Sequence, residues 1–305
     1  MSLSVLASTF ANNILPILLL SGAGFALGKL LHIDARSLGR VVFYVFSPVL
    51  IFDLLIQNRL KLNEAIGVIT LTICILSLMG LITFLLGRLF KLERAALTSI
   101  LITTIFANTG NYGLPLVSFA FGEQALSYAG IYFVTTTFLF YTVGVLIASL
   151  GHMSLKDAAL GLFRIPTMYA VILAILINLL QIQIPAPIDR AVQLAASGTI
   201  PLMLILLGVQ LTSVQLMTSV RAMQLSVSLR LLLAPLIALL LVGWFGIDGP
   251  ARQASVTEAS MPSMVSATVL ATEYQLDAKL VTAVVFISTL LSPLTLTPLL
   301  VYLGR

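Results

Sequence analysis

The spacing of the charged residues constrains this sequence more than any other feature. Two windows, 41–58 and 253–272, are almost wholly apolar and contain one acid each, Asp53 and Glu258. A hydrocarbon core of roughly 30 Å is crossed by about 20 helical residues. The pattern therefore predicts ten spans, with the start of the eighth ambiguous between Arg221 and Arg230. The other eight windows contain no Asp, Glu, Lys or Arg over at least 17 residues: 1–28, 65–87, 95–122, 124–155, 165–188, 191–220, 231–247 and 280–304.

The composition agrees with a chain that lies mostly in lipid. Hydrophobic residues make up 59% of the chain and charged residues 9%, and the mean hydropathy is +1.11. Soluble domains contain about 25% charged residues, so a soluble enzyme and a disordered protein are excluded. The apolar runs do not alternate as barrel strands do. The predicted class is an all-α membrane protein, and its expected partner is the lipid bilayer. The net charge of +5 does not indicate nucleic-acid binding.

The basic residues predict the orientation. The odd-numbered loops contain eleven Lys and Arg residues, with Arg230 counted in the seventh loop, and the opposite side contains five. Cytoplasmic loops are enriched in Lys and Arg. Residues 30–36, 90–94 and 151–156 are therefore expected to be cytoplasmic, and both termini extracytoplasmic, in a multi-pass protein of the plasma (inner) membrane. No basic segment precedes the first apolar run, so the first span is expected to be retained.

The midpoint of the chain divides the predicted spans into two sets of five. It falls inside 151–156, so residues 1–150 would contain spans 1–5 and residues 157–305 would contain spans 6–10. Because five is odd, the second set must enter the membrane with inverted orientation, as in many secondary transporters. Pro48 in span 2 and Pro201 in span 7, 153 positions apart, fit such an internal repeat.

Helix-breaking residues gather near the middle of spans 4 and 9, in the runs 106–115 and 258–263. Proline removes an intrahelical hydrogen bond, and unwound backbone persists at membrane depth only where it is buried in protein or lines a cavity. Interrupted spans at matching positions of two repeats indicate a transporter binding site. The predicted helix-break residues are Gly110, Gly113, Pro115 and Pro262.

Three motifs carry a resemblance to a known family. They are Asn108-Thr109-x-x-x-Gly113-Leu114-Pro115-Leu116, Phe46-Ser47-Pro48-Val49-Leu50, and Met261-Pro262 followed by Leu270-Ala271-Thr272-Glu273-Tyr274. With them the chain resembles the auxin efflux carrier family, which includes the plant PIN-FORMED carriers and bacterial organic-acid permeases. The long hydrophilic central loop of the plant carriers is missing, as expected of a prokaryotic homologue.

The resemblance implies a fold and a motion. The fold would be the crossover-helix fold shared with sodium–bile acid symporters, with spans 4 and 9 as the broken crossover helices. Spans 3–5 and 8–10 would form a moving transport domain, and spans 1, 2, 6 and 7 a scaffold that forms a homodimer. Transport would proceed by an elevator motion.

Polar residues beside the breaks are the candidate substrate ligands. If the second half-helices begin near Pro115 and Pro262, their positive ends converge on one cavity that suits a carboxylate. Amide and hydroxyl groups could donate hydrogen bonds to it. Alternatively, these groups only satisfy the unwound backbone. The set is Asn108, Thr109, Asn111, Tyr112, Met261, Pro262 and Ser263.

Glu258 is a single acid inside an apolar span, four residues before Pro262. An unpaired ionised carboxylate in lipid is costly, so three interpretations remain open. Glu258-x-x-Met261 resembles the sodium-binding crossover of the bile acid symporters, which implies Na⁺ held by Glu258 with carbonyls near Asn108 and Met261. Otherwise Glu258 carries a proton, or it pairs with Arg230.

These features predict a secondary transporter for a small organic anion, either an auxin-like aromatic carboxylate or a dicarboxylate. A sodium-coupled symporter of the bile-acid type is the alternative, and a channel would need rings of pore-lining charge. No catalytic residue is expected, because one buried acid does not make an intramembrane enzyme. His32, His152 and the single Cys74 do not suggest a metal site, so the expected ions are a coupling Na⁺ or proton. Gly24-x-x-x-Gly28 predicts close helix packing.

Overall fold

The computed structural model describes residues 2–57, 62–149, 165–213 and 219–304. Over these ranges the chain is almost entirely helical, and the one β-type feature is a single antiparallel bridge between Ala107 and Ser263. Helices follow from the apolar runs because a backbone in lipid has to satisfy its hydrogen bonds internally. The predicted all-α class is confirmed.

The first half of the chain contains helices interrupted by five-residue π-helical segments (η). In order they are α1 (Leu3–Thr9), η1 (Phe10–Ile14), α2 (Leu15–Leu30), α3 (Ala35–Val41), η2 (Val42–Phe46), α4 (Ser47–Gln57), α5 (Leu62–Leu89), α6 (Arg94–Ile105), η3 (Thr109–Gly113), α7 (Leu114–Leu139), η4 (Phe140–Gly144) and α8 (Val145–Ala148).

The second half repeats this style, with η5 a short 3₁₀ turn. Its elements are α10 (Pro166–Leu180), α11 (Ala186–Gln210), η5 (Leu211–Ser213), α12 (Val220–Ser228), η6 (Leu229–Leu233), α13 (Ala234–Phe245), α14 (Gly249–Ala259), α15 (Ser266–Glu273) and α16 (Ala278–Leu303).

Seven helical segments of the described residues are long and apolar enough to cross a membrane. One of them, Thr109–Ala148, is 40 residues long and is divided at Gly122, whose φ of 76° and ψ of −168° suit glycine. The shorter α6, α10, α14 and α15 fall below that length. The ten-span inverted repeat therefore stays a prediction.

Arg230 does not lie in a loop. The segment Val220–Phe245 is one continuous helical run, with Arg230 near its middle and 1% exposed. Counting Arg230 among the loop residues was therefore wrong. The ambiguity in the start of the eighth span disappears, because residues on both sides of Arg230 belong to the same helix.

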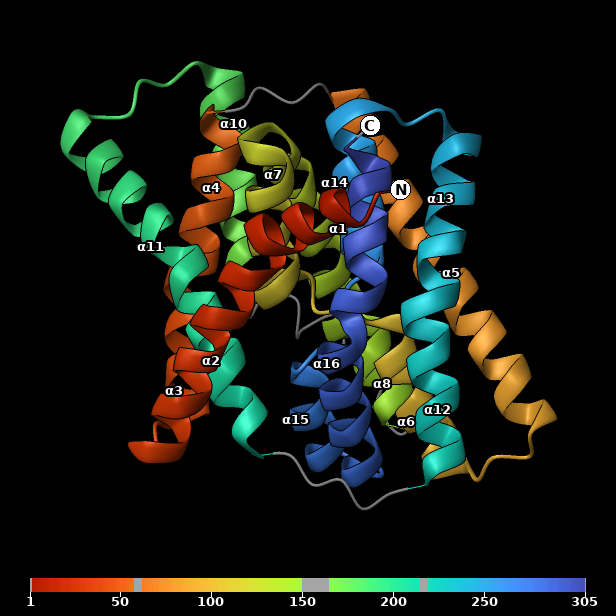
Figure 1. Ribbon diagram of the computed structural model, residues 1–305. Helices are drawn as coiled ribbons and strands as arrows, with labels where there is room; N and C mark the ends of the chain where they lie inside the picture. Colours follow the sequence, from red (N-terminus) through yellow and green to blue (C-terminus); the bar gives the residue numbers. More distant parts are fainter. Residues whose placement is uncertain (1, 58–61, 150–164, 214–218, 305) are drawn as a thin grey trace.

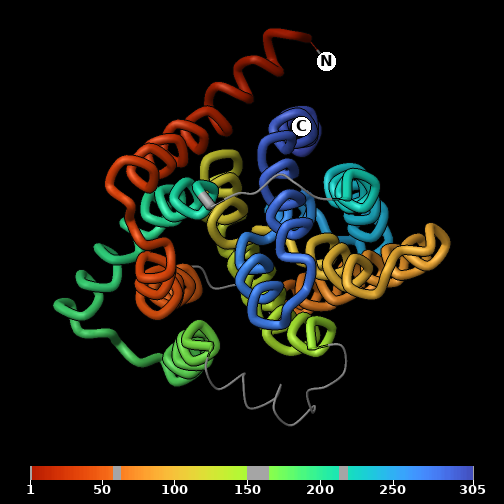
Figure 2. Tube along the Cα trace, turned by 90° about the horizontal axis from the view of Figure 1, so that it is seen from below, coloured from red at the N-terminus to blue at the C-terminus, as the bar shows by residue number. Residues whose placement is uncertain are grey.

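The helices divide into two groups (Figures 1 and 2). In the first, α11 packs along α2 and α4, and α10 packs against α4. We call α2, α3, α4, α10 and α11 the α11 group. In the second, α14 packs against α7 and α13, and α5 packs against α6 and α7. We call α5–α8 and α12–α16 the α14 group.

Glycines bring the backbones of α2 and α11 into contact. A Cβ atom on Gly24 would lie 2.1 Å from the carbonyl oxygen of Ile205, and one on Gly208 would lie 1.9 Å from that of Ser21. A Cβ on Gly28 would lie 2.8 Å from Cγ2 of Thr212. Small residues permit this approach between apolar helices. The packing role predicted for Gly24-x-x-x-Gly28 is confirmed.

Candidate functional site

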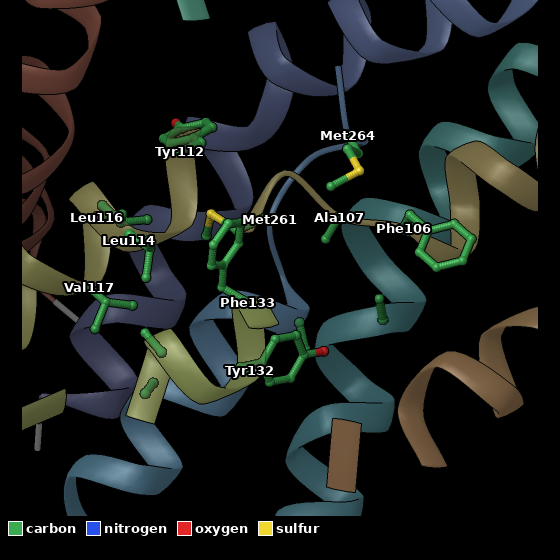
Figure 3. Close-up of a cluster of buried hydrophobic side chains, with 14 of the residues drawn as sticks. Phe106, Ala107, Tyr112, Leu114, Leu116, Val117, Tyr132, Phe133, Met261 and Met264 are labelled. Atoms are coloured by element: carbon green, nitrogen blue, oxygen red, sulfur yellow. The ribbon is translucent and has the colours of Figure 1, made fainter. Parts of the chain in front are cut away.

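Two broken helices cross in the interior of the α14 group. α6 ends at Ile105 and is followed by extended backbone at Phe106. α14 ends at Ala259 and is followed by a turn at Ser260 and by non-helical residues that lead to α15. The N–H of Asn108 donates to the carbonyl of Pro262 at 2.8 Å, and the N–H of Met264 donates to that of Phe106 at 3.0 Å. Backbone freed by each break is thus satisfied by the other segment. Figure 3 shows the two segments crossing, with Phe106 and Ala107 on one and Met261 and Met264 on the other.

Side chains from neighbouring helices complete this crossing. The hydroxyl of Ser263 donates to the carbonyl of Thr103 at 2.8 Å, and the Ser288 hydroxyl accepts from the Ser263 N–H at 3.1 Å. The Ser292 hydroxyl donates to the Tyr112 hydroxyl at 3.1 Å. The Ser263 hydroxyl therefore satisfies a backbone carbonyl of α6, in agreement with the structural alternative left open by the sequence, whereas the Tyr112 hydroxyl joins η3 to α16.

A buried arginine binds the ends of both first half-helices. The guanidinium of Arg230 donates to the carbonyl oxygen of Thr104 at 2.9 Å and to that of Ile105 at 3.4 Å, at the end of α6. It also donates to the carbonyl oxygen of Ala259, at the end of α14. The direct pair with Glu258 is not formed, because neither carboxylate oxygen of Glu258 has a hydrogen-bond partner in the structure.

Glu258 lies against the glycine that precedes α7. Its side chain is fully buried, and a Cβ atom on Gly113 would lie 2.1 Å from its Oε2 atom. Gly113 is therefore the point where the backbone of the first broken helix approaches the carboxyl group of the second. Any larger residue at 113 would displace Glu258.

Unpaired polar atoms concentrate around this crossing. The described residues contain eleven buried side-chain N or O atoms without a hydrogen-bond partner, and seven of them belong to the crossing, α14 or Arg230. Native structures leave few such atoms, and each calls for an explanation such as an ion or ligand. The concentration marks a polar site inside an apolar protein. The seven atoms belong to Asn108, Thr109, Arg230, Ser255, Thr257 and Glu258.

A cavity of about 1040 Å³ leads to the crossing from one side of the protein. Its inner wall includes Asn108, Gly110 and Asn111, and its outer rim includes exposed residues at the start of α3 and the end of α15. The Asn111 amide donates to Oε1 of Gln210 at 3.2 Å, which links η3 to α11. Aromatic residues line much of the remainder: Phe43, Tyr44, Phe133, Phe140, Tyr141 and Tyr274.

The rim of the cavity carries both signs of charge. Asp34 caps the N-terminus of α3, and hydrogen bonds from the Ser37 hydroxyl and from the N–H groups of Arg36 and Ser37 lower the pKa of its carboxyl group. Arg36 and Arg40 stand on α3, opposite Glu273 at the end of α15. The start of α3 therefore places Arg36 and Arg40 at the rim of the cavity.

The predicted site residues fall into two sets. Asn108, Gly110 and Asn111 line the cavity, and Asn108 is 3% exposed with its amide nitrogen unpaired. The others do not line the cavity and instead lie in or beside the crossing: Thr109, Tyr112, Gly113, Pro115, Glu258, Met261, Pro262 and Ser263.

Neither second half-helix begins at its proline. Pro115 lies in the first turn of α7, but helical backbone already starts at Thr109, because η3 runs directly into α7. The predicted break residues Gly110, Gly113 and Pro115 therefore lie inside this helical run, and the break itself falls at residues 106–108. Pro262 does not begin a helix, because α15 starts only at Ser266. Pro262 lies in the non-helical segment between α14 and α15, where its carbonyl accepts from the N–H of Asn108 and its missing N–H is not needed for the pairing.

Several residues that line the cavity were not predicted from the sequence. Gln210 is the one side chain with hydrogen-bonding groups in the run 200–211, and that isolation was a usable signal. Phe133 and Met264 gave no such signal, because apolar residues in a membrane span look the same whether they face lipid or a cavity.

The architecture defines a class: a polytopic helical membrane protein with a solvent-accessible cavity that ends at two crossed, broken helices. Comparison with known proteins agrees with this class. The family model described as "Membrane transport protein" matches residues 9–156 and 149–300. The chain belongs to this membrane transport protein family.

Two archaeal proteins are similar along nearly their whole length. An uncharacterized transporter of Methanothermobacter thermautotrophicus is 32% identical over 292 residues, covering 93% of this chain and 95% of the relative. An uncharacterized transporter of Methanocaldococcus jannaschii is 29% identical over 283 residues, covering 88% and 90%. These similarities point to a transport protein rather than an enzyme.

Proposed function

We propose that this chain is a secondary transporter for a small organic anion, and a prokaryotic member of the auxin efflux carrier family. The observation that carries the proposal is the unpaired amide of Asn108 at the inner end of a cavity large enough for such a molecule. The starts of η3 and α15 also border the cavity, through Gly110 and Ser266. Helix N-termini favour anions.

The lining of the cavity favours an aromatic carboxylate over a dicarboxylate. The anionic end would meet Asn108 and Asn111, and an apolar ring would pack among Phe133, Phe140 and Met264. A dicarboxylate would leave its second charge among these apolar side chains, which is costly.

The cavity lies between the two helix groups, and this supports an elevator mechanism. Its walls come from α3, η2 and α11 on one side and from η3, α7, η4 and α15 on the other. In this proposal the α14 group corresponds to spans 3–5 and 8–10 and slides along the α11 group, which corresponds to spans 1, 2, 6 and 7 and forms the homodimer. Inverted repeats over 1–150 and 157–305 would supply two equivalent end states.

The cavity would face the cytoplasm of a cell whose plasma membrane holds the protein. Removing Arg230 from the eleven basic residues of the odd loops leaves ten, still twice the five on the opposite side. Two of the ten, Lys156 and Arg164, lie outside the described residues. In Figure 1 the junction of α2 with α3 and the start of α12 lie at the lower end, whereas both chain termini lie in the upper half.

Glu258 would couple transport to a proton. Its carboxyl group is buried without hydrogen bonds beside Gly113, at the crossing that borders the cavity. A neutral carboxyl group tolerates such a site far better than an ionised one. Loss of the proton in one end state and its return in the other would link the motion to a pH gradient.

Uptake into liposomes tests the proposal. Purified protein would be reconstituted, and radiolabelled indole-3-acetate, benzoate, malate and malonate would be offered with and without a pH gradient. We expect saturable uptake of the aromatic acids, accelerated by the gradient. Uptake of none of the four above protein-free liposomes would overturn the anion assignment, and preference for the dicarboxylates would overturn the aromatic one.

The proposed coupling role of Glu258 is tested by substituting this residue. Glu258→Gln keeps the shape of the side chain and removes the proton, so uptake should lose its dependence on the pH gradient while the protein remains folded. Glu123→Gln, at an exposed acid after the Gly122 break, should leave the dependence unchanged. Uptake by Glu258→Gln that still responds fully to the gradient would assign Glu258 a structural role.

A further inference from the structure

Arg230 has a long charged side chain that is buried inside the protein, away from both solvent and lipid. It is 1% exposed and lies in η6, the π-helical segment that joins α12 to α13. A π-helical turn inside an α-helix re-aims the side chains it carries and is frequent at functional sites. Here it accompanies a guanidinium directed at backbone carbonyls of two other helices.

All three carbonyls that Arg230 binds lie at the C-terminal ends of helices. Thr104 and Ile105 are the last residues of α6, and Ala259 is the last residue of α14. The last carbonyls of a helix have no intrahelical donor and carry its partial negative charge. Two such ends converge here inside the protein, and their convergence requires a cation or several donors between them.

We infer that the guanidinium of Arg230 is a built-in cation that joins the C-terminal ends of the two broken half-helices, so that the crossing needs no bound metal cation there. A guanidinium offers five N–H donors in a rigid plane, which suits carbonyls from two directions. The three carbonyls that it binds are among those freed by the helix breaks.

This inference bears on the sodium site implied by the resemblance to bile acid symporters. That site would use Glu258 and freed carbonyls near Asn108 and Met261. In the structure Arg230 binds the carbonyl of Ala259, the residue next to Glu258. The Pro262 carbonyl accepts from Asn108, and the Glu258 carbonyl accepts from the N–H of Met261 at 3.3 Å. The carbonyls of Asn108, Glu258, Ala259 and Pro262 are thus engaged, and a fixed positive charge lies beside Glu258, so this set of oxygens does not fit Na⁺.

The test uses the thermal stability of the purified protein, which does not require a known substrate and is therefore independent of the transport proposal. The wild type should have the same Tm in sodium chloride and in choline chloride at equal ionic strength. Arg230→Ala should lower Tm by roughly 5–10 °C, because removing one partner of a buried polar network leaves the others unpaired. Low millimolar guanidinium chloride should restore much of that loss.

Three comparisons separate a cation role from simple packing. Urea, a neutral molecule of similar shape, should not restore the Tm of Arg230→Ala. Arg230→Lys should retain part of the stability, because an ammonium keeps the charge but lacks the planar array of donors. Arg252→Ala is the matched control, since Arg252 lies over the Tyr302 ring, at 5.4 Å from its centroid, and its variant should not respond to guanidinium.

Two results would overturn the inference. One is a wild-type Tm that rises with Na⁺ but not with choline, because the crossing would then bind a metal cation despite Arg230. The other is equal restoration of Arg230→Ala by urea and guanidinium, because volume rather than charge would then be needed. If Arg230→Ala does not fold, the Tm of Arg230→Lys is measured instead in sodium chloride, choline chloride and guanidinium chloride. A Tm equal to that of the wild type in all three salts would show that no guanidinium is required.

Discussion

Asn108 contributes its backbone to the fold and its side chain to the cavity. Its N–H donates to the Pro262 carbonyl at 2.8 Å, and its carbonyl accepts from the N–H of Gly113 at 3.0 Å. These two bonds hold the residue at the crossing whatever its side chain is. The amide nitrogen of the side chain, in contrast, has no partner. Binding and folding can therefore be separated at this position.

Asn108→Ala should weaken substrate binding without a comparable loss of stability. Losing one hydrogen bond to a charged group costs about 1.5–3 kcal/mol, which is roughly 10- to 100-fold in affinity. Both affinity and Tm would be measured on purified protein with an aromatic carboxylate that passed the uptake assay. Equal affinity in the variant and the wild type would remove Asn108 from the site.

Asn178→Ala is the matched control for that substitution. The Asn178 amide donates to the Leu55 carbonyl at 2.9 Å, which ties α10 to α4 away from the cavity. Its removal should lower Tm slightly and leave the affinity unchanged.

At the scale of elements, two glycines of α2 lie on different faces of the helix: Gly24 faces α11 and Gly22 faces open space. A Cβ atom on Gly24 would overlap the backbone of α11, whereas one on Gly22 would meet nothing within 4 Å. Gly24→Ala should therefore force α2 and α11 apart and destabilise the protein by about 1–3 kcal/mol. Gly22→Ala should be neutral or stabilising by about 0.4–1 kcal/mol. Thermal unfolding of both variants checks this, and similar Tm values would contradict the close packing.

The elements also show what the sequence could predict and why. The spacing of charges predicted the helices, because exclusion of charge from lipid is a strong one-dimensional signal. The breaks were predicted from the clusters of Asn, Gly and Pro in the runs 106–115 and 258–263. The sequence could not predict that α15 begins at Ser266 instead of near Pro262, because the intervening segment pairs with residues 106–108, more than 150 positions away. The sequence also could not predict the burial of Arg230, because its partners are backbone carbonyls, which every residue has.

The whole molecule has two sides that labelling can distinguish. Leu31, at the end of α2, is 66% exposed, and Ile182, between α10 and α11, is 52% exposed. In a Cys74→Ser background, a membrane-impermeant maleimide added to intact cells should label Ile182→Cys and spare Leu31→Cys. The reverse pattern would invert the orientation and turn the cavity to the outside. The loop 151–156, which is also expected to be cytoplasmic, lies outside the described residues.

The elevator proposal requires the two helix groups to slide past each other, and one contact between them can be locked. A Cβ atom on Gly130 of α7 would lie 2.9 Å from Cδ1 of Ile51 on α4, so cysteines at both positions should form a cross-link between the groups. Cysteines at Leu55 and Asn178 would instead join α4 to α10 within the α11 group.

Cross-linking Ile51→Cys with Gly130→Cys should abolish transport while substrate still binds, because binding needs one end state and transport needs both. A reducing agent should restore uptake. Cross-linking Leu55→Cys with Asn178→Cys should leave uptake intact, since both residues belong to the group that stays fixed. The measurement is uptake by proteoliposomes, with the fraction cross-linked read in parallel by mass spectrometry of the peptides. Full transport with the first pair completely cross-linked would mean that α7 and α4 do not move relative to each other, and the alternation of access would then have to occur within the α14 group itself.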